Sequence, residues 1–145
     1  MAKQAITELV AIMSTITPVS AVTETLTGTQ IDMYEFHEAL FIAHGDSIAT
    51  TGVFHLDIWG GAGSGVNSAV ITGKTAATSA SSVTASYQVI RVTAEEAAAQ
   101  GYRYLFPLVT CLGTSAYIAM TGFGVHPRYA PADELDIAAV SEIIT

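Results

Sequence analysis

The sequence predicts a mainly β protein: a single antiparallel β-barrel or sandwich with one short helix near residues 93–100 and extended terminal segments. At 145 residues the chain is long enough for one domain with a hydrophobic core and too short to argue for two. From Ser20 onward, short runs rich in β-branched and aromatic residues are separated by Gly, Ser, Thr, Asp or Asn. Short strands at such regular spacing are typical of barrels and sandwiches.

Residues 1–19 are predicted to form an N-terminal arm or a short helix. Ile6, Leu9 and Met13 recur at helical spacing, but the many Thr and Ile residues of this segment suit an extended arm equally well. Pro18 ends any helix here because it lacks an amide hydrogen. The sequence leaves both conformations open.

Residues 20–125 are predicted to form the barrel or sandwich. The stretch "GVFHLDIWG" alternates cleanly, with Val53, His55, Asp57 and Trp59 on one face and Phe54, Leu56 and Ile58 on the other. "YRYLFPLVTCL" and "SAYIAMTGF" are interpreted as two separate strands. The residues predicted to fill the core are Phe41, Phe54, Leu56, Ile58, Val89, Leu105 and Val109.

One helix is expected to interrupt the strands. Thr93 and Glu96 have the spacing of a capping box, and Gly101 suits the end of the helix. The small-residue stretches Gly60–Gly65 and Thr75–Ser82 are predicted to be hairpin tips that stay mobile unless a neighbouring residue orders them.

The sequence contains no recognisable catalytic, cofactor or metal motif, so we expect no enzyme activity. "TGKT" has Ser68 where a phosphate-binding loop needs glycine, and the glycines of "GGAGSG" lack dinucleotide-binding spacing. The four histidines have no zinc-site spacing. His55 and Asp57 would share one strand face, which favours a solvated or subunit-facing polar pair over a catalytic one.

Composition indicates partner chains and argues against nucleic acid and membrane. Half of the residues are apolar, only 12% are charged, and the mean hydropathy is +0.46, so some apolar surface is expected to meet other subunits. The net charge is −8, and the five basic residues are scattered, which disfavours direct nucleic-acid binding. No apolar run approaches the roughly 20 residues of a membrane span. The single cysteine, Cys111, is interpreted as core filler.

Residues 126–145 are predicted to form a proline-stiffened docking segment. Pro127 and Pro131 fix the backbone, so His126 to Pro131 should be a stiff linker outside the ladder of strand hydrogen bonds. Arg128 and Tyr129 are residue types suited to protein contacts, although the same loop could instead fold onto its own domain. The residues predicted to contact partner chains are Ile6, Leu9, Met13, Trp59, His126, Pro127, Arg128, Tyr129 and Pro131.

Two stretches together resemble a known group of proteins. "LTGTQIDMYEFHEALFIAHGD", Leu26 to Asp46, and "GVHPRYAPAD", Gly124 to Asp133, are similar to the start and end of small β-rich virion proteins of tailed bacteriophages, which include capsid cement, or decoration, proteins. The resemblance implies a virion protein on the outer surface of the head, present as a homotrimer, that ties major capsid subunits together. It carries over no catalytic residues.

Two other functions stay open on the sequence. One is another structural part of the virion, such as a tail, neck or head-fibre component. The other is a small sugar-binding β module, because Trp59 and the tyrosines could stack on sugar rings, although they are spread over separate strands.

Overall fold

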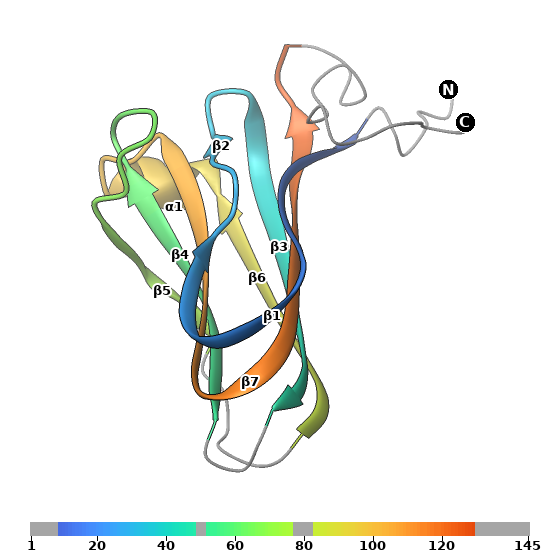
Figure 1. Ribbon diagram of the computed structural model, residues 1–145. Coiled ribbons are helices and arrows are strands. Elements are labelled where there is room, and N and C mark those ends of the chain that lie inside the picture. The colour runs from blue at the N-terminus through green and yellow to red at the C-terminus, as the bar shows by residue number, and fades with distance from the viewer. Residues whose placement is uncertain (1–8, 49–51, 77–82, 130–145) are drawn as a thin grey trace.

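The computed structural model describes residues 9–48, 52–76 and 83–129, and it is an antiparallel β-sandwich with one short helix (Figure 1). This confirms the predicted fold class and decides between its two forms. The path of paired strands runs from β5 to β6 without closing, so the described strands form no closed barrel.

The sandwich has two layers that share their long strands. The elements are β1 (Val10–Thr27), β2 (Ile31–Asp32), β3 (Phe36–Ile48), β4 (Val53–Gly61), β5 (Ala69–Ala76), β6 (Val83–Thr93), α1 (Ala94–Ala99) and β7 (Tyr104–Pro127). The first layer contains β5, β4, β2, the first half of β7 and the end of β1. The second layer contains β6, β3, the second half of β7 and the start of β1.

β7 and β1 each bend from one layer into the other, as Figure 1 shows at the lower end of the sandwich. The two strands predicted over residues 102–123 are therefore one continuous strand, and that prediction was wrong. At the bend, Gly113 has φ +79° and Thr23 has φ +50°, a left-handed geometry that glycine adopts without strain. The Gly113 amide donates to the Thr23 hydroxyl at 3.4 Å, which ties the two bends together.

The start of the chain is extended where the structure describes it. Val10–Thr27 is one strand, so it passes through the boundary expected at residue 19. The helix considered for residues 1–19 is therefore wrong for residues 10–19. Bulges interrupt its pairing with β7 around Met13, Pro18 and Thr23. Residues 1–8 lie outside the described residues. None of the described helical structure has the length and hydropathy needed to cross a membrane.

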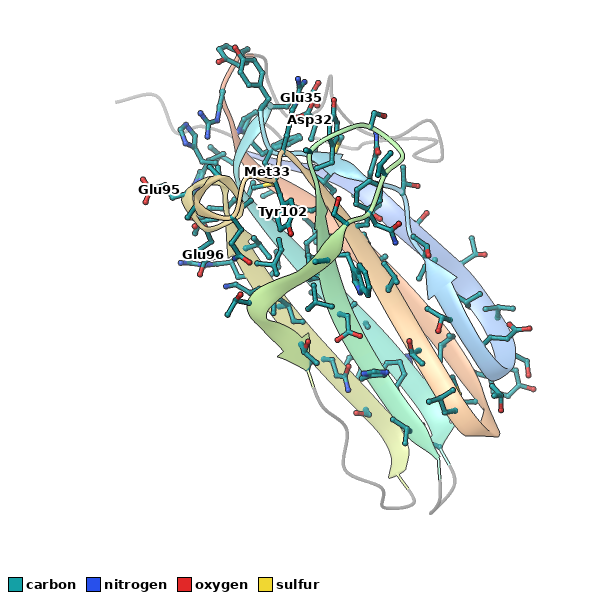
Figure 2. All side chains as sticks on the ribbon, turned by 90° about the vertical axis from the view of Figure 1, so that its left-hand side faces the viewer. Asp32, Met33, Glu35, Glu95, Glu96 and Tyr102 are labelled. Atoms are coloured by element: carbon teal, nitrogen blue, oxygen red, sulfur yellow. The ribbon has the colours of Figure 1, made fainter. Side chains whose placement is uncertain are left out.

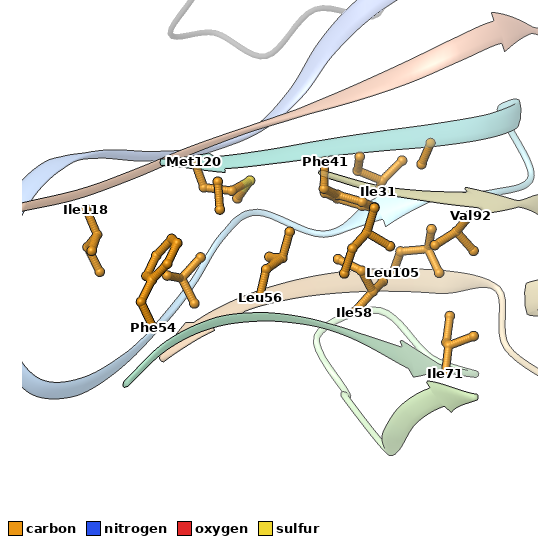
Figure 3. Packing of buried hydrophobic residues seen from close by; sticks show 14 of the residues in the cluster. Ile31, Phe41, Phe54, Leu56, Ile58, Ile71, Val92, Leu105, Ile118 and Met120 are labelled. Carbon is orange, nitrogen blue, oxygen red and sulfur yellow. The ribbon is translucent and has the colours of Figure 1, made fainter. Parts of the chain in front are cut away.

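The core lies between the layers and is built from alternate residues of facing strands (Figure 3). Six of the seven predicted core residues are buried: Phe41, Phe54, Leu56, Ile58, Leu105 and Val109. Val89 is not, since 59% of its surface is exposed. Its neighbours Gln88 and Ile90 point inward, and successive residues of a strand face opposite ways, so Val89 lies on the outer face.

Two glycines of β7 make room for aromatic rings of the core. A methyl group at Gly124 would lie 2.5 Å from a ring carbon of Phe36, and one at Gly122 would lie 2.9 Å from a ring carbon of Phe41. Both rings are fully buried. The close approach of backbone to ring therefore requires glycine at these positions.

A buried amide joins the two layers. The Gln88 side chain of β6 accepts a hydrogen bond from the Leu56 amide at 2.6 Å and donates to the Phe54 carbonyl at 2.9 Å. Among the described residues, β5 pairs with β4 as far as Leu56. Gln88 thus ties β6 to the edge of β4 at this point.

The helix α1 begins and ends as predicted. The Thr93 hydroxyl accepts from the Glu96 amide, and the Glu96 carboxylate accepts from the Thr93 amide, which completes the capping box. Lys74 of β5 lies 2.9 Å from the Glu96 carboxylate, so the lysine of the "TGKT" stretch has a structural partner. Gly101 has φ +79° directly after the helix.

A neighbouring residue orders the glycine-rich tip between β4 and β5. Gln30 donates to the Ser64 hydroxyl at 2.6 Å and accepts from the Gly65 amide at 2.7 Å. The tip is therefore tied to the chain just before β2. Residues 77–82 of the second predicted tip lie outside the described residues.

Candidate functional site: two assembly surfaces

Reactive side chains are dispersed in the described part of the chain. In residues 9–48, 52–76 and 83–129, no group of three or more His, Cys, Asp or Glu side chains could hold a metal ion. His55 and Asp57 lie 3.7 Å apart on the outer face of β4, as expected for a polar pair. Cys111 is buried, and burial raises the pKa of its thiol, which opposes formation of the reactive thiolate.

The first surface, which we call the elbow cluster, consists of Asp32, Tyr34, Arg103, Tyr104 and Tyr129. It lies at the end of the sandwich where β2 meets β7, the end that also carries α1 (Figure 2). The Arg103 guanidinium lies 5.1 Å from the ring centre of Tyr34 and 5.0 Å from that of Tyr104. The Tyr129 ring lies 5.6 Å from the Tyr34 ring. Cation–π and ring contacts of this kind hold the side chains in one arrangement.

The ion pair of Asp32 and Arg103 lies at the centre of the elbow cluster. Arg103 Nε donates to the Asp32 carboxylate at 2.8 Å, and Nη2 donates to it as well. Burial alone would raise the pKa of Asp32, but the hydrogen bonds from Arg103 and the Tyr34 amide, together with the charge of Arg103, hold that pKa below its usual range. The same pairing raises the pKa of Arg103.

Replacing Asp32 with asparagine is therefore expected to destabilise the fold at neutral pH and to matter less in acid. A carboxylate whose pKa is lower in the folded state stabilises the protein above its unfolded pKa, and this contribution is lost as pH falls through the folded value. Thermal melts of both proteins at pH 7 and between pH 4 and pH 2 test this. A difference in melting temperature that stays constant down to pH 2 would contradict it.

The end of β7 presents exposed residues from a fixed backbone. The Arg128 amide donates to the Glu35 carbonyl at 2.8 Å, and Arg128 Nε donates to the Phe36 carbonyl at 3.3 Å. Tyr34 and Tyr129 are 59% and 70% exposed.

A shallow hollow of about 280 Å³ opens between Arg128 and Tyr102, with Met33 in its lining. Figure 2 shows Met33 and Tyr102 on the same side of this end as Glu95 and Glu96.

The second surface is the outer face of the second layer, which we call the apolar face. Residues 38 to 46 of β3 alternate between buried and half-buried, so Leu40 and Ile42 point away from the core. Val89 and Tyr87 of β6 and Phe123 and Tyr117 of β7 lie on the same side. The apolar face is defined by Leu40, Ile42, Tyr87, Val89, Tyr117 and Phe123.

The structure brings only part of the predicted contact set together. His126 and Pro127 belong to β7, where Pro127 pairs with Phe36 and the His126 amide donates to the Leu9 carbonyl, so the linker outside the ladder was a wrong prediction for these two residues. The pairing of β7 with β3 therefore continues as far as the elbow cluster. Arg128 and Tyr129 are exposed beside it, and their role as contacts stays a prediction.

The other predicted contacts are elsewhere. Met13 is half-buried and packs against the core, and Leu9 is half-buried in a turn. Trp59 lies on the outer face of the first layer, where its indole nitrogen is buried without a hydrogen-bond partner among the described residues. Ile6 and Pro131 lie outside the described residues.

Sequence reasoning missed Tyr34, Arg103 and the apolar face. The run "ALFIAH" is apolar at successive positions, a pattern typical of a strand covered on both faces, and it is the signal that could have revealed the apolar face. No local signal pairs Arg103 with Asp32, because 71 residues separate them.

No family model matches this chain, and no curated protein sequence is similar to it. Similar solved structures include one of infectious bursal disease virus Gx strain, with 10% identity and a TM-score of 0.47, of which this chain spans 33%. Another is a Bacillus endospore appendage, one of a family of disulfide-linked pili, with 12% identity and a TM-score of 0.40, over 98% of that chain. The structure titled "CBM4 structure and function" has 9% identity and a TM-score of 0.39 and covers 72% of this chain and 61% of that one. Likenesses at this level carry no argument about function.

Proposed function

We propose that the chain is a non-enzymatic structural protein of a virion, a capsid cement protein that binds the outer surface of the head and stabilises contacts between major capsid subunits. One observation carries the proposal. The described parts of the two stretches that resemble phage virion proteins, Leu26 to Asp46 and Gly124 to Asp133, meet beside the elbow cluster. Tyr34 contacts Tyr129, and Arg128 binds the backbone of Glu35. Part of each stretch therefore contributes to one surface.

The chemistry of this surface suits adhesion. Tyrosine and arginine dominate the binding energy of protein interfaces because they bury a large area and also form hydrogen bonds. Arg128 and Tyr129 are exposed, and the Arg128 backbone is held by its hydrogen bond to Glu35, so less conformational entropy is lost on binding. A weak contact of this kind, repeated around a shell, becomes strong collectively.

Particles that carry Arg128→Ala or Tyr129→Ala are expected to lose heat resistance, whereas the isolated variants should melt near the wild-type temperature. Both side chains are exposed, and Arg128→Ala removes one side-chain hydrogen bond, so each substitution costs the fold about 1 kcal/mol or less. The measurement is particle survival at raised temperature, with Val66→Ala, at an exposed loop position, as the control. Unchanged particle survival with both Arg128→Ala and Tyr129→Ala would contradict the proposed contact with the shell.

A particle map tests the position on the head. Density for the chain at local threefold sites of the head would support the proposal, and density along the tail or neck would support the tail or neck alternative instead.

A further inference from the structure

The apolar face has the composition of the centre of a protein interface. Tyr87, Val89 and Tyr117 are each more than half exposed. Half-buried Ile42 lies beside Val89, and Leu40 lies beside Phe123 two residues earlier along β3. Charge is confined to the two ends of the face: Glu38 and Arg91 pair at 3.4 Å at one end, and Asp46 lies at the other. An apolar, tyrosine-rich centre with charge at its margin is the pattern of specific interfaces.

The apolar face also carries a projection and a hollow at the same position along the strands. Tyr87 and Val89 project from β6 and form what we call the ridge; the Tyr87 ring is held by stacking on His44, with ring centres 4.6 Å apart. On β3 and β7 a shallow hollow of about 200 Å³ is lined by Ile42, Ala119 and Phe123, among others. His44 pairs with Tyr87 on one side and with Ala119 on the other, so ridge and hollow share the same rows of the sheet.

We infer that the apolar face binds a second copy of this chain, with the ridge of each copy in the hollow of the other. A twofold axis parallel to β3 preserves the rows of the sheet and exchanges the two sides of the face. It places β6 of one copy over β7 of the other, so that the ridge meets the small side chain of Ala119 in the partner. Sheets pack face to face in this way in ordinary sandwich cores.

The size of the face is sufficient for such a pair. Three strands about 4.8 Å apart, over the length from Glu38 to Asp46, outline roughly 430 Å² in each copy. Side chains and the adjoining part of β1 enlarge this, so two copies bury on the order of 1,000 Å², the area at which specific interfaces begin. The contact is separate from the elbow cluster, so it does not depend on the proposed role at the shell.

Light scattering during gel filtration is the first test. The full chain is expected at twice its mass of 15.1 kDa. Val89→Glu should raise the dissociation constant at least tenfold, whereas Val66→Glu, a change at a loop residue of nearly equal exposure, should not. A wild-type monomer at all concentrations would overturn the inference, and so would the homotrimer that the sequence resemblance implies.

Complementary variants test the ridge and the hollow themselves. Tyr87→Ala with Val89→Ala removes the ridge, and Ala119→Phe fills the hollow; each protein alone should be monomeric, with the circular dichroism spectrum of the wild type. An equimolar mixture should form a heterodimer, because the remaining ridge enters the remaining hollow and the introduced phenyl ring occupies the space that the ridge has left. Failure of the mixture to associate, when both variants are folded, would overturn this arrangement.

Discussion

Replacing Gln88 with leucine is expected to lower the free energy of unfolding by about 3 kcal/mol, because it leaves two buried backbone groups without the partners that Gln88 supplies. The Leu56 amide loses its acceptor, and the Phe54 carbonyl loses this donor. Leucine has a similar volume, so the effect comes from polar groups and not from a cavity. For a chain of this size the loss corresponds to a fall in melting temperature of about 10 °C.

The matched control is Gln100→Leu. Gln100 also binds backbone through its side chain, accepting from the Thr72 amide at 3.1 Å, but it is exposed, so water replaces the lost partner. Its loss should cost about 1 kcal/mol or less. Chemical denaturation of the three proteins measures the difference. Equal destabilisation by the two substitutions would show that Gln88 does not join the layers in the way described.

Replacing Gly124 with alanine is expected to destabilise the fold by about 3 kcal/mol, at the upper end of what overpacking a core costs. The added methyl group would lie within 2.6 Å of three carbons of the Phe36 ring, which is fully buried and has no room to retreat. The same substitution at Gly63, where a methyl group meets nothing within 4 Å, should be close to neutral.

A second substitution distinguishes overpacking from a general loss of backbone freedom. Phe36→Leu in the Gly124→Ala background shortens the side chain that causes the clash, so it should restore part of the lost stability. The measurement is the unfolding midpoint in denaturant for each single variant and for the double variant. Additive losses in the double variant would contradict a direct clash between the methyl group and the ring.

The parts of the fold that could be predicted depend on short-range patterns. Thr93 and Glu96 are three residues apart, and their capping box forms within one turn of helix. The alternation in Val53–Gly61 follows from the pleat of a single strand. Neither feature needs a partner from far along the chain, so sequence alone was sufficient.

The parts that could not be predicted depend on distant partners. β7 continues through Gly113 because the bends of β1 and β7 meet there, and a glycine between two apolar runs otherwise indicates a turn. The orientation of Val89 depends on which of the two sets of alternate residues in β6 faces the core. Both sets contain apolar residues, so the sequence leaves this undecided. Arg128 and Tyr129 were predicted as contacts from their residue types. Their partners within the fold, Glu35 and Tyr34, lie far away along the sequence, so no local pattern could reveal them.

In our proposals the two surfaces serve two separate contacts of an assembly. The elbow cluster presents tyrosine and arginine beside the end of β7, and the apolar face presents an aliphatic and aromatic sheet. In the proposed arrangement the first binds the shell and the second binds another copy, so each pair could bridge neighbouring sites and gain from multivalency.

The most direct test of the proposed cement role is the melting temperature of emptied, expanded phage heads that lack the chain. Purified chain is added to these heads, and bound protein and head melting are recorded as its concentration rises. The account predicts saturable binding and a rise in the melting temperature, both reduced by Arg128→Ala and Tyr129→Ala. Absence of binding, or binding that leaves the melting temperature unchanged, would contradict it.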